Sequence, residues 1–430
     1  MKIKTRRITW EAYKDLPKIP HLKPKKPWFF LQTLVRLLSI PDLLATRFSY
    51  TKEGLDRAGE GPYLILMNHS SFLDLKIASR ILFPHPYNIV STTDAFVGKA
   101  FLMRNLGCMP TQKFVTDVSL VMDLIRTIKK EKRSVLMFPE AGYSFDGTST
   151  VLPRRLGGLL KRLGVPVLFI ETDAGGFLRD PLYNGLRLRK VKVSARFSCL
   201  LTREEIKEKS IEELDAVLDE AFSFDHFLSQ RKNRIPVTEP FRATGLERVL
   251  YRCSHCGSES GMKGEGTRLS CSACGTAHEM DEYGALSCIN GKTLFSHIPD
   301  WVNFQRESVK KELEENRYRL EIPVQVGVIC DHKALYMVGE GTLTHDRSGF
   351  TLSSADGTFS YHQDPYSSYS LNADFFWYEI GDVIGIGNKE KLFYCFPQLP
   401  TPVAKARLAT EEMYHMPKPE KAAARKTNEE

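Results

Sequence analysis

The sequence predicts an α/β domain, then a small cysteine-bearing module, then a mainly antiparallel β domain that ends in a helix. Within 60–235, short apolar runs alternate with stretches of helical period, which is typical of βα units around a mixed sheet. Two Cys-x-x-Cys pairs fall in 245–292, a region dense in Gly and Ser. In 293–415, a polar helical stretch leads into alternating apolar and polar residues and a closing helix. A chain of 430 residues suits such a division, since single cores seldom grow beyond about 300 residues.

Residues 1–59 are predicted to form basic, amphipathic helices that contact a membrane. The first 60 residues hold 13 Lys and Arg against 6 Asp and Glu, so most of the net charge of +8 lies there. Polar residues and a proline interrupt the apolar stretch 27–45, so it is not predicted to span a membrane. Apolar side chains behind a basic leader favour a helix in a membrane interface, and the alternative is a helix packed on the protein's own core. The side chains concerned are Trp28, Phe29, Phe30, Leu34, Leu37 and Leu38.

The α/β domain is predicted from strands that lead through polar loops into amphipathic helices. The first strand runs into Asn68 and His69, and two serines suited to capping precede a helix expected near Phe72. The predicted strands are 63–67, 87–92, 134–138 and 165–171, and the predicted helices are 118–130, 155–163 and 203–222.

The β domain is predicted to hold a helix over 301–318, strands within 324–397 and a closing helix over 402–415. On this pattern of elements it is similar to pleckstrin-homology or GRAM modules. Residues 416–430, rich in Lys, Glu and Ala, are predicted to be a disordered tail.

His69 and Asp74 are the candidate catalytic residues. They lie five residues apart across a predicted loop-to-helix junction, where the first helical turn can carry the carboxylate back under the imidazole. A carboxylate there fixes the ring tautomer and leaves the other nitrogen free to take a hydroxyl proton. Taken alone, this pair is more typical of a helix cap or a core histidine. The motif Phe138-Pro139-Glu140-Ala141-Gly142 favours catalysis, because it follows a buried strand that βα topology would bring to the same sheet edge.

These blocks resemble the glycerolipid acyltransferase superfamily, which includes lysophosphatidic acid and glycerol-3-phosphate acyltransferases. Asn68 to Asp74 resembles its His-(four residues)-Asp motif, and 138–140 resembles its Phe-Pro-Glu-Gly block. The segment 101–113 is similar to the intervening acceptor-binding block, and 165–167 is similar to the final strand motif. The four blocks stand in family order and cover under half of the chain.

The resemblance implies an acyl-CoA or acyl-carrier-protein donor and a lysophosphatidic-acid-like acceptor, used in phospholipid biosynthesis. His69 would deprotonate the acceptor hydroxyl, and Asp74 would orient the imidazole. The residues implied in acceptor binding are Pro139, Glu140, Gly142, Arg104 and Lys113. Two departures leave the acceptor open. The family often has Gly-Thr-Arg after Phe-Pro-Glu, where this chain has Ala-Gly-Tyr, and often has Arg, a better bidentate phosphate ligand, where this chain has Lys113.

Cys253, Cys256, Cys271 and Cys274 predict a zinc ribbon. The two Cys-x-x-Cys pairs have 14 residues between them and each is followed by Gly, a spacing that supplies four thiolates in tetrahedral geometry. Four thiolates leave no open position, so the Zn²⁺ is expected to be structural. Such cysteine usage is also more typical of a reducing compartment than of a disulfide framework.

The interpretation is therefore a cytoplasmic O-acyltransferase, peripheral or monotopic on a membrane surface. The first residues are polar and basic, unlike a secretory signal. The alternative is a catalytically degenerate binding protein that uses the ribbon for protein or nucleic-acid contacts. No basic run interleaved with aromatics surrounds the ribbon, so nucleic acid is not expected. Another acceptor, such as a different lysophospholipid or an amino-acid lipid, stays open. A fragment of residues 1–245 is expected to remain active without the ribbon.

Overall fold

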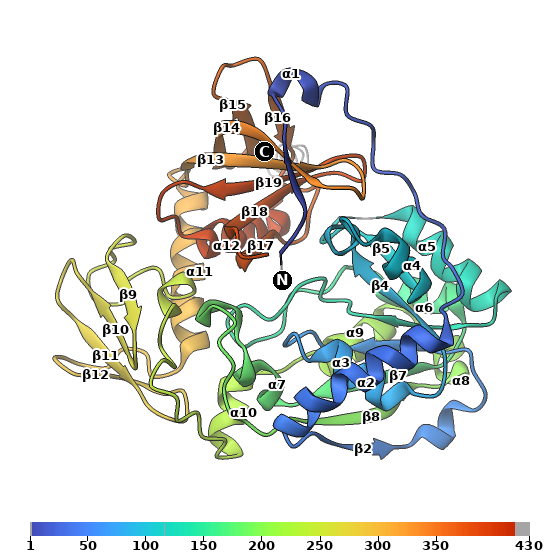
Figure 1. Cartoon of the computed structure of the whole chain (residues 1–430). Coiled ribbons are helices and arrows are strands. Elements are labelled where there is room, and N and C mark those ends of the chain that lie inside the picture. The colour runs from blue at the N-terminus through green and yellow to red at the C-terminus, as the bar shows by residue number, and fades with distance from the viewer. Residues whose placement is uncertain (1, 116, 418–430) are drawn as a thin grey trace, which may run out of the picture.

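The computed structural model describes residues 2–115 and 117–417, so the predicted tail lies outside the described residues except for its first two positions. Figure 1 shows the α/β domain, the cysteine-bearing module and the β domain as three neighbouring parts. Helix α11 (Ile298–Glu314) stands between the cysteine-bearing module and the β domain.

Seven strands form the mixed sheet of the α/β domain, in the order β2-β8-β7-β3-β6-β4-β5. Strands β7 and β8 pair antiparallel, and the other neighbours pair parallel. Because β3 and β6 are parallel neighbours, the loops that follow them leave from the same edge of the sheet. The strands are β2 (Ser49–Glu53), β3 (Leu64–Met67), β4 (Tyr87–Thr92), β5 (Cys108–Thr111), β6 (Ser134–Met137), β7 (Val167–Thr172) and β8 (Ser194–Leu201).

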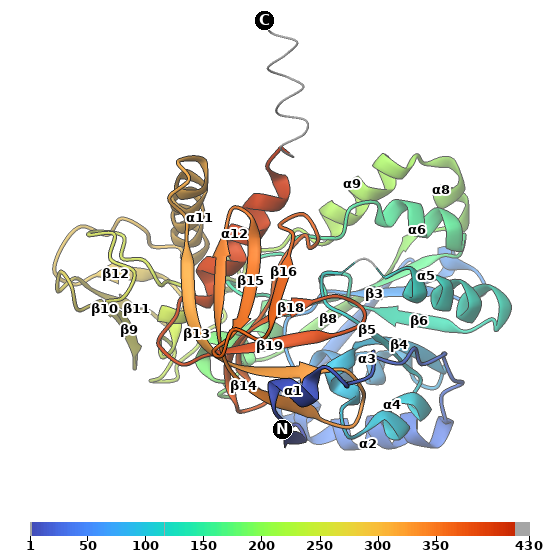
Figure 2. The ribbon, with the colours of Figure 1, turned by 90° about the horizontal axis from the view of Figure 1, so that it is seen from above.

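Helices cover both faces of this sheet, which explains why its central strands are continuously apolar. In β3, Leu64 and Leu66 belong to one buried cluster, and Ile65 and Met67 belong to another. Figure 2 shows α2, α3 and α4 on one side of the strands and α6, α8 and α9 on the other. The helices are α2 (Phe29–Ala45), α3 (Asp74–Leu82), α4 (Ala100–Asn105), α5 (Val118–Ile125), α6 (Leu156–Leu163), α7 (Ala174–Arg179), α8 (Arg203–Glu208), α9 (Ile211–Ala221) and α10 (His226–Lys232).

The single helix expected over 203–222 is wrong, because two helices occupy this stretch. Thr202 caps α8 and Ser210 caps α9, and each is paired in a capping box with the glutamate three residues later. Lys209 between them is extended, so the second serine starts a new helix. The helix predicted over 118–130 is confirmed as α5 with a π-helical continuation, Arg126–Lys130.

The cysteine-bearing module is a four-stranded antiparallel sheet in the order β12-β11-β10-β9. The C-terminal part is an antiparallel sheet with the path β16-β15-β14-β13-β19-β18-β17, followed by helix α12 (Val403–His415). This confirms a β-rich domain with a closing helix, while its likeness to pleckstrin-homology or GRAM modules stays a prediction. Its strands and those of the cysteine-bearing module are β9 (Met262–Glu265), β10 (Arg268–Cys271), β11 (Ala277–Met280), β12 (Leu286–Cys288), β13 (Leu320–Ile329), β14 (Leu335–Asp346), β15 (Gly349–Ser354), β16 (Ser360–Gln363), β17 (Asn372–Trp377), β18 (Gly381–Gly387) and β19 (Leu392–Pro397).

The first residues are not the membrane-contact helices expected from the sequence. Strand β1 (Thr5–Arg7) pairs parallel with β14, and the short helix α1 (Trp10–Tyr13) stacks Trp10 on Phe359 at 4.7 Å between ring centroids. One buried cluster runs through Trp10, Phe145 and Trp301 to the last helix. The α/β domain, the cysteine-bearing module and the β domain therefore share a hydrophobic core.

Candidate active site

His69 and Asp74 meet where β3 gives way to α3. The Nδ1 atom of His69 donates to Asp74 Oδ2 at 2.9 Å, and the backbone N–H groups of Ser70 and Ser71 donate to the same oxygen at 2.8 and 3.1 Å. Because two amides already point at this oxygen, it is an acceptor, and Nδ1 is the protonated nitrogen of the ring. Within the described part of the chain Nε2 has no hydrogen-bond partner, so its lone pair is available to accept a proton.

Hydrogen bonds fix the backbone of His69 as well as its ring. Its N–H donates to Glu140 Oε2 at 2.7 Å, and its carbonyl accepts the N–H of Ser144 at 3.0 Å. The other oxygen of Glu140 accepts the N–H of Thr150 at 3.1 Å. Glu140 is wholly buried, and this burial raises the pKa of its carboxyl to about 8 although the two backbone donors oppose the shift. The carboxyl of Glu140 thus joins three loop segments at the sheet edge.

Aromatic rings enclose the imidazole. Phe138 lies 4.3 Å and Tyr143 lies 3.9 Å from it between ring centroids, and Phe72 stacks on Tyr143 at 4.8 Å. The side chain of His69 is still 19% exposed. Burial, Asp74 and two further aspartates hold the pKa of Tyr143 well above its usual range, so the phenol stays neutral. These contacts could not be predicted from the sequence, because the spacing of the aromatic residues carries no signal of its own.

A second set of polar contacts fixes the loop that follows β3. Asn68 donates to the carbonyl of Thr172 at 3.1 Å and accepts its N–H at 2.7 Å, so the ends of β3 and β7 are tied together. The hydroxyl of Ser70 lies 3.2 Å from His226 Nε2. Burial lowers the pKa of His226 to about 3, so this histidine is neutral and acts as a hydrogen-bonding partner. This role of His226 was not predicted from the sequence.

The implied acceptor-binding residues come from three different segments of the domain. Pro139, Glu140 and Gly142 are close to His69 in the loop after β6, but both oxygens of Glu140 are engaged by backbone amides. The expectation that Glu140 shapes the acceptor pocket stays a prediction. Lys113 lies 4.0 Å from Asp374 of β17, and among the described residues the buried Nε of Arg104 has no hydrogen-bond partner.

Comparison with known proteins identifies the region that carries this site. Residues 48–167 match the sequence model of the Acyltransferase family, and both His69 and Glu140 fall within this match. Residues 48–167 are an acyltransferase domain. This confirms the resemblance to the glycerolipid acyltransferase superfamily.

A solved structure with similarity to the chain is the 1-acyl-sn-glycerophosphate (LPA) acyltransferase PlsC from Thermotoga maritima. It is 17% identical, the match covers 44% of this chain and 76% of that one, and the TM-score is 0.36. No curated protein shows significant similarity to the chain.

Apolar side chains lie open to solvent on one side of the acyltransferase domain. In α2 they include Phe30 at 62% and Leu38 at 68% exposure, and Phe101 of α4 is 72% exposed beside Trp28, 6.0 Å away between ring centroids. Phe72, which stacks on Tyr143 at the active site, is also exposed. In the described part of the chain, no helix has the length and apolar character needed to cross a membrane. The exposed apolar residues of this surface are Trp28, Phe29, Phe30, Leu34, Leu37, Leu38, Leu44, Phe72, Leu75, Phe101 and Leu102.

A cavity of about 560 Å³ lies between the loop 149–156 and helix α9. Its lining includes Thr150, Arg154, Arg155, Asp215 and Phe222, but neither His69 nor Asp74. In this lining, Nη2 of Arg154 forms a hydrogen bond of 2.8 Å with Nδ1 of His415 in α12. The cavity borders the acyltransferase site through Thr150, and it is not the place where the His69 ring is exposed.

The four cysteines of the cysteine-bearing module come together outside the acyltransferase domain. Their sulfur atoms all lie within 4.8 Å of one another, and two pairs, Cys253–Cys274 and Cys256–Cys271, are 3.7 Å apart. A tetrahedral site with metal–sulfur bonds of about 2.3 Å places its sulfurs about 3.8 Å apart, so the donor set fits a metal ion. Gly257 and Gly275 close each loop with positive φ, 74° and 75°, which explains the glycine after each pair.

Proposed function

We propose that the protein transfers a fatty acyl group from acyl-CoA or acyl-carrier protein to the hydroxyl of a lysophosphatidic-acid-like glycerophospholipid. His69 is the general base and Asp74 orients it. The observation that carries this proposal is the contact of His69 Nδ1 with the buried Asp74 carboxylate at 2.9 Å, while Nε2 has no partner among the described residues. The acyltransferase domain at 48–167 supports the same class of reaction.

In the proposed reaction, Nε2 of His69 takes the proton of the acceptor hydroxyl while the oxygen attacks the thioester carbonyl. The tetrahedral intermediate then collapses, the carbon–sulfur bond breaks, and the thiolate leaves with the proton returned by His69. The products are an ester and a free thiol, so no covalent enzyme intermediate is needed. The Asp74 carboxylate stabilises the imidazolium that forms between the two steps.

For the acceptor phosphate we propose Arg104 in preference to Lys113. Lys113 is partly neutralised by Asp374, and burial raises the pKa of Asp374 to about 6 despite the opposing effect of Lys113. Arg104 has a buried Nε with no partner in the described structure and offers a bidentate fork for phosphate. Gly142 and Pro139 shape the loop beside the reacting hydroxyl.

We place the reaction at a membrane surface, because an acceptor with a long acyl chain resides in a bilayer. The exposed apolar side chains include those of α2 and also Phe72, which lies next to the site. Lys23, Lys25 and Lys26 are exposed immediately before α2, whereas Lys18 pairs with Glu390 at 2.8 Å. Apolar insertion and a short basic stretch supply the two attractions that stable attachment needs.

We further propose that the metal of the cysteine cluster is Zn²⁺ and that it is structural. Four thiolates complete a tetrahedral coordination shell, and the cluster is far in sequence from the acyltransferase domain. When bound, the ion holds the two loops of the module together, and no step of acyl transfer involves it.

The test is turnover of purified full-length protein with labelled acyl-CoA or acyl-carrier protein and a panel of lyso-lipid acceptors, read by mass. We expect product with a lysophosphatidic acid and none from His69→Ala. A degenerate binding protein would give no product with any donor or acceptor. Product with only a non-phosphate acceptor would keep the mechanism and replace the proposed acceptor.

A further inference from the structure

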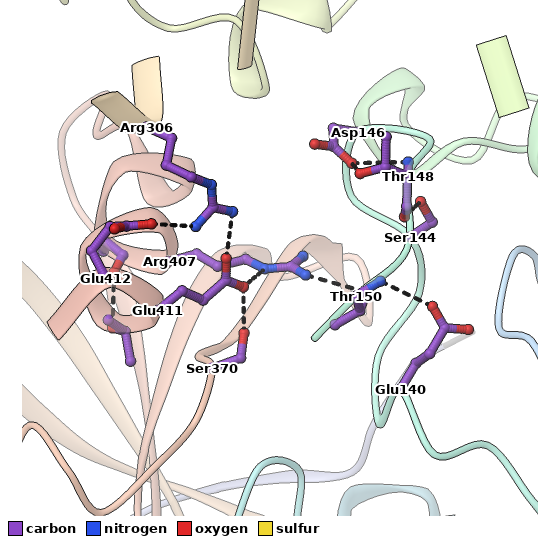
Figure 3. Close-up of polar contacts among 12 residues, drawn as sticks. Glu140, Ser144, Asp146, Thr148, Thr150, Arg306, Ser370, Arg407, Glu411 and Glu412 are labelled. Carbon is purple, nitrogen blue, oxygen red and sulfur yellow. Dashed lines mark hydrogen bonds and ion pairs between the residues drawn. The ribbon is translucent and has the colours of Figure 1, made fainter. Parts of the chain in front are cut away.

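A chain of buried polar contacts joins the last helix of the β domain to Glu140 (Figure 3), and Glu140 in turn contacts the backbone of His69. Glu140 accepts the backbone N–H of His69 through Oε2 and that of Thr150 through Oε1. The hydroxyl of Thr150 in turn accepts Arg407 Nη2 of α12 at 3.3 Å. Arg407 lies 257 residues from Thr150 in the sequence, so the contact depends on how the β domain docks.

Arg407 is itself fixed on its own side. Its Nε donates to Glu411 Oε1 at 3.0 Å, and its guanidinium lies 4.7 Å from the ring centroid of Phe145. Glu411 also accepts the hydroxyl of Ser370 at 2.7 Å and Arg306 Nη2 of α11 at 2.6 Å. Burial by itself would raise the pKa of Glu411, but the two arginines and the serine hold it below its usual value, so Glu411 is ionised.

These contacts are shielded from water. Thr150 is 4%, Glu411 2% and Arg407 9% exposed, and Glu140 is wholly buried. Charges alternate from Arg407 through Glu411 to Arg306, so the buried Glu411 carboxylate has an opposite charge on each side. A buried ionic chain of this kind is costly to break at one member, because the remaining charges lose their compensation.

We propose that Arg407 is a positioning residue for acyl transfer: through Thr150 and Glu140 it sets the place of the His69 backbone, so the β domain is part of the catalytic unit. This inference rests on the proposed function of His69. A fixed Thr150 holds its N–H on one oxygen of Glu140, which leaves the other oxygen aimed at His69. Loss of Arg407 frees the Thr150 loop and with it the carboxyl that holds the catalytic loop.

Charge adds to this geometry. The groups that face the Glu140 carboxyl are Asp74 of α3, which favours its neutral form, and Arg407 of α12, which favours its ionised form, beside the amides of His69 and Thr150. An ionised carboxylate accepts both amides fully, whereas a protonated one has a single good acceptor oxygen. Replacing Arg407 by a neutral residue therefore raises the pKa of Glu140 further and weakens one amide contact in the pH range where the wild-type carboxyl is ionised.

The experiment compares Arg407→Met and Arg407→Lys in the full chain. Arg252→Met is the matched control, because Arg252 also pairs with two carboxylates, Glu259 and Glu312, without reaching Thr150. We expect Arg407→Met to lower kcat about 10- to 100-fold, the scale of a misplaced catalytic group, with little change in KM. Arg407→Lys should recover most of kcat, and Arg252→Met should resemble the wild type.

Two readouts separate positioning from general destabilisation. Hydrogen exchange of the peptide that contains His69 should rise in Arg407→Met and not in Arg252→Met. The acid limb of kcat against pH should move to higher pH in Arg407→Met, and the shift should vanish when Glu140→Gln is already present.

Equal loss of kcat in Arg407→Met and Arg252→Met, or wild-type kcat and exchange in folded Arg407→Met, would overturn the inference. If Arg407→Met does not fold, Thr150→Val removes only the hydroxyl and keeps every charge. Raised exchange at His69 with lower kcat in Thr150→Val then supports the inference, and unchanged values overturn it. Full turnover by His69→Ala would instead refute the proposed function, while the exchange experiment would still report on the link from Arg407 to His69.

Discussion

The carboxyl of Glu140 accepts the backbone N–H of His69 at 2.7 Å across 71 residues of sequence. The contact joins the loops after β3 and β6, which are parallel neighbours in the sheet. It explains how two motifs far apart in the chain act as one structural unit. The imidazole is oriented by Asp74 and the peptide of His69 is held by Glu140, so ring and backbone have separate supports.

Removing either member of the proposed catalytic pair should abolish acyl transfer in folded protein. We expect His69→Ala to lower kcat by about 10²- to 10⁴-fold, the usual loss of a general base. Asp74→Asn should be similarly severe, because its amide can turn an N–H toward Nδ1 and reverse the tautomer. Single-turnover measurements with labelled donor check both variants. Near wild-type turnover of His69→Ala would rule out the mechanism.

Glu140 should make the stability of the fold depend on pH. Its pKa is about 8 in the folded chain and about 4.3 in an unfolded one, so the folded state binds the extra proton. Its stabilising contribution is complete below about pH 4 and is lost as pH rises through 8. In urea unfolding from pH 5 to 9, the wild type should therefore lose stability relative to Glu140→Gln. A constant difference between the two proteins would contradict the raised pKa.

Metal removal should unfold the cysteine-bearing module and loosen α11 beside it. The indole N–H of Trp301 in α11 donates to the carbonyl of Arg252 at 2.9 Å, and its ring contacts His278 of β11. We expect about one equivalent of zinc by elemental analysis, and chelation or Cys271→Ser should change Trp fluorescence and lower the unfolding temperature. Cys288→Ser is the control, since Cys288 lies outside the cluster. Metal-free protein with unchanged unfolding would contradict the site.

Binding to anionic vesicles should use both charge and apolar contact. Replacing Trp28, Phe29 and Phe30 with Ser should release the protein from vesicles and lower activity on vesicle-borne acceptor more than on a short-chain one. Leu228→Ser and Leu399→Ser serve as controls, since these leucines are exposed on other parts of the molecule.

High salt should weaken binding of the wild type without abolishing it, because only the lysine contribution is screened. Neutralising Lys23, Lys25 and Lys26 should remove most of this salt dependence. If wild-type protein fails to sediment with anionic vesicles at low salt, the exposed apolar side chains of α2 do not bind a membrane and the prediction is wrong.

The local patterns of the sequence were sufficient to predict most helices and strands and the contact between His69 and Asp74. The strand over 87–92 and the closing helix could be predicted from the periodicity of apolar residues, and the pair could be predicted from its spacing across one loop. Contacts between parts of the chain could not be predicted in this way. No periodicity indicates that Arg407 reaches Thr150 or that Asp374 approaches Lys113, because such contacts follow from docking.

The shared core also revises one expectation. A fragment ending at residue 245 would lack Arg407 and the sheet that pairs with β1. It would also expose Phe145 and Phe177, which belong to the same buried cluster as residues of α11 and α12. We now expect this fragment to be inactive and poorly folded, as circular dichroism and turnover would show.

The pairing of β1 with β14 bears on the order in which the protein folds. The indole N–H of Trp10 donates to the carbonyl of Glu340 at 3.2 Å, across 330 residues of sequence. Contacts between such distant residues pay a large loop-closure entropy and form slowly. During synthesis, β1 is made before β14 and must therefore wait for it before it finds its place. In refolding experiments, the fluorescence of Trp10 should report a late step, after the α/β core has already formed.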